Sequence, residues 1–142
     1  MAFSYKHFLV IGATAGIGLE LAEQLIKDGR KVTAVGRRQE RLDQFVKKHN
    51  NNNNVANGIS FDISDLKKIP EFVDKVTSEA PDIDALVLNA GIQLPYNLAD
   101  RQGFDLEKFH HEILVNFSSM VSLVHAFLPW LLAKSVPTSI LV

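Results

Sequence analysis

The chain has 142 residues, of which 46% are hydrophobic, and this suits one ordinary domain with a single core. Fifteen Lys and Arg residues against sixteen Asp and Glu residues give a formal net charge of −1, so nothing in the charge attracts nucleic acid or anionic lipid. The chain has no cysteine, which excludes disulfides, thiolate nucleophiles and Cys-ligated zinc sites and favours a cytoplasmic protein.

We expect neither a secretory signal nor a membrane span. The first apolar run, residues 8–11, is only four residues long before a glycine interrupts it. The most membrane-like stretch, residues 113–133, contains Asn116, His125, Pro129 and three serines. Polar atoms are costly in lipid, so this stretch predicts a buried helix instead.

Short apolar segments alternate with longer segments of helical period. The apolar segments predict strands at 7–11, 31–35, 58–61, 85–88 and 138–142. Continuous apolar runs such as Ala85-Leu86-Val87-Leu88 are typical of strands that are covered on both faces. The alternation therefore predicts an α/β fold, in which helices cover a parallel sheet.

Four helices are expected between these strands. The first follows Gly16 and stops at Gly29, the second spans 39–49, and the third spans 69–79 with Pro70 in its first turn. The asparagine tract at 50–54 predicts a surface loop, because Asn bonds its own backbone and tolerates left-handed geometry.

The fourth helix, residues 105–134, has an unusually wide apolar surface. Spacing residues 100° apart gives one apolar stripe: Leu106, Phe109, Ile113, Phe117, Met120, Val124, Leu128 and Leu131. Apolar neighbours widen it to an arc of about 200°, against the roughly 100° that a helix on a sheet needs. We expect part of this arc to contact another element or another chain.

A glycine-spaced loop between the first strand and the first helix carries the sharpest signal. Gly12 allows a tight turn out of the strand, Gly16 leaves room for a diphosphate, and Gly18 lets the helix pack on the sheet. The helix amino terminus then offers free N–H groups to the anion. The intervening Thr14 and Ala15, with Ile17, are candidate contacts. The alternative is a glycine-rich turn needed only for packing.

Two arginines stand where the second strand ends. An acidic residue at this position would bind the ribose hydroxyls of NAD, but the sequence has Arg37 and Arg38. Guanidinium groups suit a 2′-phosphate, through charge-assisted bonds worth about 1.5 to 3 kcal/mol each, which points to NADP. The alternative is an ordinary solvated basic face that Arg41 continues.

With these features the chain resembles the short-chain dehydrogenase/reductase family over residues 7–142. The loop is similar to the family's Thr-Gly-x-x-x-Gly-x-Gly, with Ile11 in the place of Thr. Leu88-Asn89-Ala90-Gly91 is similar to Asn-Asn-Ala-Gly, with Leu88 in first place. The resemblance implies a Rossmann-like doubly wound sheet of strand order 3-2-1-4-5, with helices on both faces, ending after the fifth strand.

The resemblance also implies site residues. Asp62 and Ile63 fit the pair that contacts the adenine ring, and Asn89, Ala90 and Gly91 join the cofactor site.

Asn116 lies 27 residues after Asn89, at the place of the family's helix asparagine. That residue distorts the helix locally and helps to hold a water in the proton relay, so Asn116 is the catalytic candidate. From the residues alone, its amide lies in the apolar arc and needs a partner, since an unpaired amide costs about 1 to 3 kcal/mol. The alternative is a core asparagine that bonds to backbone.

The family's chemistry also needs a Ser near the end of the fifth strand and a Tyr followed four residues later by Lys. Here Tyr5 is followed by Leu9 and Tyr96 by Asp100, and Ser139 opens the last apolar run instead of closing it. The five histidines predict no metal site. We therefore expect residues 1–142 to form one NADP-binding domain of an oxidoreductase that is not catalytic alone.

Two other functions stay open: a non-catalytic NADP-sensing regulatory or interaction protein, and an enzyme whose missing half comes from another chain. Without further elements, the helix at 105–134 or the edge strand at 138–142 should mediate self-association, with at least about 800 Å² buried per partner. Leu94, Tyr96 and Arg101 are expected at the near edge of a substrate pocket.

Overall fold

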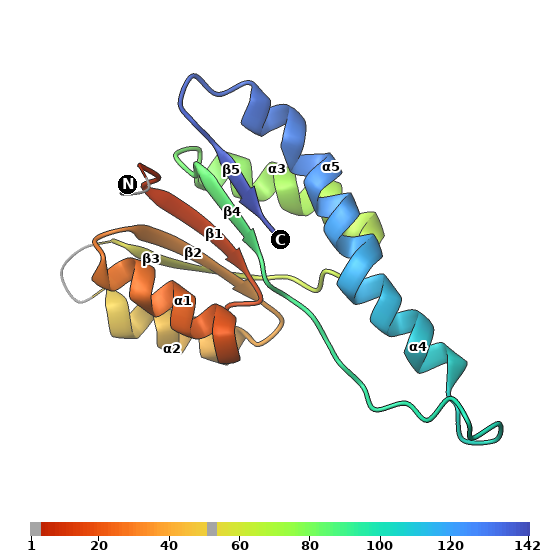
Figure 1. The fold of residues 1–142 in the computed structure, drawn as a ribbon. Coiled ribbons are helices and arrows are strands. Elements are labelled where there is room, and N and C mark those ends of the chain that lie inside the picture. Colours follow the sequence, from red (N-terminus) through yellow and green to blue (C-terminus); the bar gives the residue numbers. More distant parts are fainter. Residues whose placement is uncertain (1–3, 51–53) are drawn as a thin grey trace.

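A parallel five-stranded sheet forms the centre of the molecule. The computed structural model describes residues 4–50 and 54–142. The strands, β1 (His7–Ile11), β2 (Lys31–Gly36), β3 (Ala56–Ser60), β4 (Ala85–Leu88) and β5 (Ser139–Leu141), lie in the order β3-β2-β1-β4-β5. Every neighbouring pair is parallel. The strand order of a doubly wound sheet is confirmed (Figure 1).

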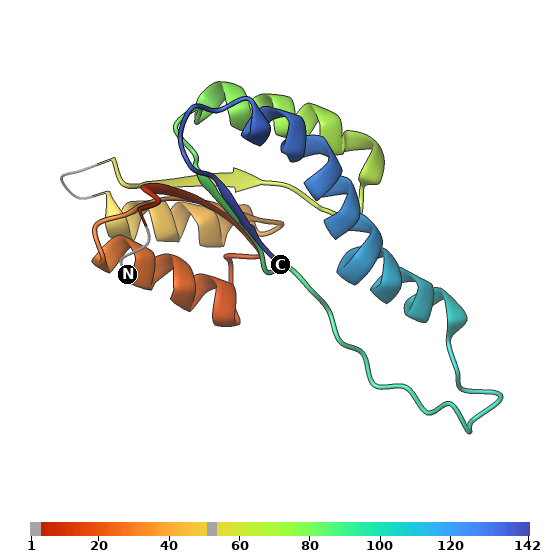
Figure 2. The ribbon, with the colours of Figure 1, turned by 45° about the horizontal axis from the view of Figure 1, so that its top comes forward.

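Helices cover both faces of this sheet and make three layers. Helices α1 (Gly16–Lys27) and α2 (Gln39–His49) lie on one face. Helices α3 (Ile69–Glu79) and α5 (Ser119–Leu132) lie on the other, and a short turn, η1 (Leu66–Lys68), precedes α3 (Figures 1 and 2). Each face of the sheet buries its own hydrophobic cluster.

Strand β3 begins two residues before the expected range and ends at Ser60 instead of Phe61. The cause is the side chain of Asn50, at the end of α2. Its Oδ1 accepts hydrogen bonds from the N–H groups of Val55 and Ala56, and its Nδ2 donates to the Ala56 carbonyl at 2.6 Å. This contact aligns the chain with β2 from Ala56 onward. The predicted loop at 50–54 lies largely outside the described residues.

The fourth helix is divided, which the periodicity did not predict. It consists of α4 (Leu106–Ile113), a π-helical turn η2 (Leu114–Ser118) and α5. A π turn inserts an extra residue and rotates everything after it. The expected stripe was wrong in part: Met120 and Leu131 are buried, whereas Phe117 and Leu128, within and after the turn, are exposed. Leu106 and Ile113, on α4 before the turn, are exposed as well. The buried face of α5 is formed by Ser119, Met120, Leu123, Phe127 and Leu131.

The segment Leu106–Leu132 is long and apolar enough to cross a membrane by length and composition alone. This is weak evidence, because the core helices of soluble proteins pass the same test. In this fold one face of α5 packs into the cluster that covers the sheet and α3. The apolar composition is thus accounted for in part by the core.

A polar network fixes the amino edge of the sheet. The buried His7 ring contacts Oδ1 of Asp82 through Nδ1 and Oγ1 of Thr33 through Nε2, both at 2.9 Å. Asp84 accepts hydrogen bonds from the N–H groups of Lys6 and His7. Burial lowers the pKa of His7, against the opposing effect of Asp82, so the ring is neutral in the folded protein at neutral pH.

The neutral state of His7 predicts acid sensitivity. Between its depressed folded pKa and its ordinary value of 6.5, only the unfolded chain binds the proton, so the free energy of unfolding should fall as pH drops below about 6.5. Urea denaturation at pH 7.5, 6.5 and 5.5 measures this. His7→Gln should weaken the dependence, whereas His125→Gln, at an exposed position, should retain it. Equal slopes for the two variants would contradict the assignment to His7.

Candidate functional site

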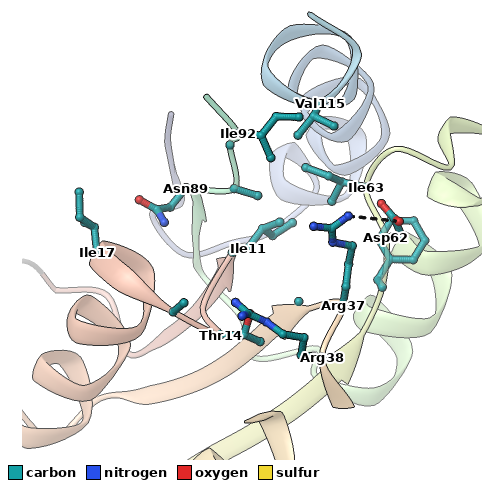
Figure 3. Close-up of a pocket in the computed structure, with 16 residues that line it drawn as sticks. Ile11, Thr14, Ile17, Arg37, Arg38, Asp62, Ile63, Asn89, Ile92 and Val115 are labelled. Atoms are coloured by element: carbon teal, nitrogen blue, oxygen red, sulfur yellow. Dashed lines mark hydrogen bonds and ion pairs between the residues drawn. The ribbon is translucent and has the colours of Figure 1, made fainter. Parts of the chain in front are cut away.

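A cavity of about 770 Å³ lies at the carboxyl ends of the strands. It opens where the strand order reverses between β1 and β4, the position at which doubly wound sheets bind ligands. Figure 3 shows residues from both sides of the sheet around it. The lining residues are Ile11, Gly12, Thr14, Ala15, Ile17, Gly36, Arg37, Arg38, Phe61, Asp62, Ile63, Asn89, Ala90, Gly91, Ile92 and Val115.

The loop after β1 is held rigidly against the sheet. Gly12 has φ of +90°, and the N–H groups of Gly12 and Ala13 donate to the Val35 carbonyl at 2.9 and 3.0 Å. A Cβ on Gly12 would stand 2.7 Å from the backbone of Ala90. Both the φ angle and the close approach therefore require glycine.

Gly16 opens α1 and leaves a space that a side chain would fill. Its φ is +56°, and a Cβ built there would have no atom of the described residues within 4 Å, apart from its chain neighbours and the adjoining helix backbone. Within the described chain no side chain caps α1, whose N-cap is Ala15, and its first turn contains no acidic residue. Free N–H groups and the positive end of the helix dipole thus face an open space, which suits a diphosphate.

Gly18 lies beneath this space and does not line the cavity. A Cβ there would overlap the Gly12 carbonyl oxygen and stand 2.6 Å from Nδ2 of Asn89. The N–H of Asn89 donates to the Ile11 carbonyl at 3.0 Å, which ties the end of β4 to the end of β1. Gly18 therefore serves the close packing of α1 on the sheet.

Two arginines converge on Thr14 from the end of β2 and the start of α2. Nη2 of Arg38 donates to Oγ1 of Thr14, and Nη1 of Arg41 donates to its carbonyl oxygen, both at 3.1 Å. The Thr14 methyl group lies against Gly36, where a Cβ would overlap it. Thr14 is consequently buried and fixed.

Arg37 points across the cavity toward Asp62, as Figure 3 shows, with 3.9 Å between Nη1 and Oδ2. Burial alone would raise the pKa of Asp62, but hydrogen bonds from the Ser64 N–H and hydroxyl, together with the Arg37 and His111 charges, lower it below its ordinary range. The site therefore has one ionised carboxylate and two guanidinium groups at this end.

Asn116 lies outside the cavity lining and contacts it through Ile92. Its Oδ1 accepts from the Ile92 N–H at 2.8 Å, and its Nδ2 donates to the Ile92 carbonyl at 2.6 Å. Both polar ends of the amide are satisfied, although the residue is exposed and not in the core as its place in the apolar arc suggested. The π turn surrounds this residue, where the family resemblance implies a distortion.

The structure brings most of the candidate cofactor residues to one cavity. Of the thirteen, only Gly16 and Gly18 do not line it. Five lining residues were not predicted: Ile11, Gly36, Phe61, Ile92 and Val115. The first three lie at or next to the ends of expected strands, and that position was the available signal. Leu94, Tyr96 and Arg101 do not line this cavity.

Comparison with known proteins gives one consistent family. Residues 6–141 match the family model of the short chain dehydrogenases. The NADP-dependent 3-hydroxy acid dehydrogenase YdfG of Shigella flexneri is 33% identical over 127 residues, which cover 89% of this chain and 49% of that protein.

Solved structures agree with this result. The serine dehydrogenase of Escherichia coli superposes with a TM-score of 0.80 at 31% identity, covering 94% of this chain and 59% of that one. An alcohol dehydrogenase of the archaeon Thermococcus sibiricus, complexed with 5-hydroxy-NADP, gives 0.79 at 29% identity, covering 89% and 53%. The chain thus spans about half the length of the relatives it matches.

Proposed function

Because the chain belongs to the short-chain dehydrogenase family, we propose that it is the NADP(H)-binding portion of an oxidoreductase that acts on a carbonyl or alcohol substrate. The coenzyme, when bound, would supply a hydride to a carbonyl as NADPH or accept one from an alcohol as NADP⁺. The cytoplasmic location expected from the cysteine-free composition is part of the same proposal.

The observation that carries the proposal is the open space at Gly16. The amino end of α1 has no side-chain cap, the described residues beyond Gly16's own neighbours leave the space around its Cβ position open, and the loop before it is rigid; together these features suit a diphosphate. Gly12, Thr14, Ala15 and Ile17, which flank Gly16 in the sequence, line the cavity.

The choice of NADP over NAD rests on the basic corner. Arg37 and Arg38 are the residues that would bind a 2′-phosphate, since guanidinium groups pair with phosphate through two parallel bonds. Asp62 and Ile63 form the wall beside them and would hold the adenine. Asn89, Ala90 and Gly91 also line the cavity and would lie beside the nicotinamide.

Turnover needs groups that these 142 residues do not combine. No tyrosine is followed four residues later by lysine, and Asn116 is the one catalytic candidate. We infer that this chain alone, as a single coenzyme-binding domain over residues 1–142, binds NADPH without reducing a substrate. In the alternative, another chain supplies the remaining catalytic groups. Reductase activity should then be measured only when the two chains are mixed.

Calorimetric titration tests the function. NADPH should bind saturably to one site per chain, and NADH should bind more weakly. If neither coenzyme binds at millimolar concentration, the proposed function is wrong.

A second candidate, a non-catalytic NADP sensor that associates with itself or a partner, rests on a specific observation. Exposed apolar side chains line the outer face of the long helix: Leu106, Ile113, Phe117, Val121, Leu128 and Leu132. Within the described residues the edge strand β5 pairs with β4 alone, and it ends at the exposed Leu141, which the exposed Val142 follows. Exposed apolar side chains that gather on one surface favour association.

Negative charges introduced on the long helix should abolish this self-association. We expect the wild-type chain to sediment as a dimer or larger at concentrations near 100 μM, a range typical of weak protein association. The double variant Val121→Glu/Leu128→Glu should shift it to monomer, since each buried aliphatic side chain contributes about 1.5 to 3 kcal/mol. Gln44→Glu, exposed on α2, is the control. If the double variant still sediments as a dimer or larger, the interface lies on β5 and not on the long helix.

A further inference from the structure

The connection between β4 and α4 is fastened to the helix in a regular pattern. We call residues 92–96 the strap; they form neither helix nor strand. Exposure alternates along it: Ile92, Leu94 and Tyr96 are partly buried, whereas Gln93 and Pro95 are exposed. One side of the strap therefore faces protein, and the other faces solvent.

Each partly buried strap residue has a partner on the long helix. Ile92 exchanges two hydrogen bonds with Asn116. The N–H of Leu94 donates to Oε2 of Glu112 at 3.0 Å. The ring of Tyr96 meets that of Phe109 edge-on, with centroids 5.7 Å apart. Successive strap residues thus contact helix residues of decreasing number, so the strap and the helix run antiparallel.

The spacing of these contacts fits the geometry of both elements. Four residues of helix, from Asn116 to Glu112, span about 6 Å at 1.5 Å per residue. Two residues of extended chain, from Ile92 to Leu94, span about 6.6 Å. A slip of one residue along the strap would turn its polar contacts away from the helix.

These contacts matter because α4 has little else to hold it. None of its residues is buried, and Figure 1 shows it extending past the end of the sheet. An aromatic group formed by Tyr96, Phe104 and Phe109 closes the far end of the strap. The Glu112 carboxylate is the hydrogen-bond acceptor between this group and the Asn116 contact.

Glu112 also lies near the phenol of Tyr96. Burial of the hydroxyl, with the Glu112 and Asp105 charges, raises the pKa of Tyr96 to about 12. The phenol is therefore protonated at neutral pH. Its hydroxyl is buried without a hydrogen-bond partner among the described residues, so the hydrogen bond from Glu112 to the strap is the one to the Leu94 N–H.

The strap leads into the cavity. Ile92, at its start and three residues after Asn89, and Val115, next to Asn116, both line the cavity (Figure 3). We propose that Glu112 is a positioning residue: by holding the N–H of Leu94 it fixes the register of the strap on α4, and thereby holds Ile92 as the wall on the nicotinamide side of the cavity. The last clause rests on the proposed function.

Hydrogen exchange tests the first part directly. In Glu112→Ala, exchange in the 92–96 segment should accelerate at least about tenfold, as expected when a charge-assisted bond is lost. Glu112→Gln retains an acceptor oxygen and should stay within about threefold of wild type. Glu107→Gln, exposed on the same helix, is the control for charge. Wild-type exchange rates in Glu112→Ala, or equal acceleration in the Gln and Ala variants, would overturn the positioning role.

Ligand binding tests the second part. The fragment 2′,5′-ADP contains only the adenine half of the coenzyme, and its affinity should be unchanged in Glu112→Ala. The affinity for NADPH should fall about threefold to tenfold in the same variant and recover in Glu112→Gln. An equal loss for both ligands, or no loss for NADPH, would overturn this part. If the wild-type chain binds neither ligand, the proposed function and the nicotinamide clause fail together, and the exchange result still decides the role of Glu112 at the strap.

Discussion

Replacing Gly16 by alanine is expected to weaken NADPH binding about 100-fold while the protein stays folded. The new methyl group would occupy the open space at the amino end of α1, where no described atom lies within 4 Å of a Cβ. Displacing the diphosphate from two N–H groups removes roughly two charge-assisted hydrogen bonds of about 1.5 kcal/mol each, which equals about 100-fold in affinity. Calorimetric titration measures the change.

Gly29→Ala is the matched control for this prediction. Gly29 also has positive φ, +77°, and open space around its Cβ, but it follows the other end of α1. Both variants should lose about 1 to 2 kcal/mol of stability, because alanine is strained in the left-handed region. Only Gly16→Ala should lose coenzyme affinity. Equal affinities in the two variants would show that no diphosphate binds at α1.

The double variant Arg37→Ala/Arg38→Ala should lose selectivity between the coenzymes. Two guanidinium groups account for the preference, so affinity for NADPH should fall about 100-fold, at about 1.5 kcal/mol per charge-assisted bond. Affinity for NADH, which has no 2′-phosphate, should change by less than about threefold. Parallel titrations with the two coenzymes give the ratio.

Two controls separate selectivity from other effects. Arg38 also bonds Thr14, so damage to the loop would weaken NADPH and NADH binding alike. Lys75→Ala, on the exposed side of α3, removes a positive charge far from the basic corner and should leave both affinities unchanged. If the double variant still preferred NADPH, the 2′-phosphate would have to bind elsewhere.

The sequence predicted the sheet well because its signals are local. The apolar runs predicted the first and last residues of β1 and β4 correctly. The glycine spacing after β1 predicted the turn that leads into α1. The start of β3 was missed because Asn50 sets it through contacts with Val55 and Ala56 across a turn. Such a tertiary contact leaves no trace in the hydrophobic pattern of the strand itself.

The long helix shows the same limit more clearly. Periodicity assumes a constant 100° per residue, and the π turn at Leu114–Ser118 breaks that assumption. The two hydrogen bonds between Asn116 and Ile92 join segments 24 residues apart. The family resemblance indicated a distortion of the helix at Asn116, whereas the apolar stripe gave no sign of it. The apolar stripe also did not predict that Val115 lines the cavity, because Val115 lies in the π turn.

A crystal structure of the chain with NADPH would show where the coenzyme binds. We expect the diphosphate against the amino end of α1, over Gly16, with the 2′-phosphate between Arg37 and Arg38. Density for the coenzyme anywhere else, or a cavity at the ends of β1, β2 and β4 that stays empty at saturating NADPH, would contradict this expectation.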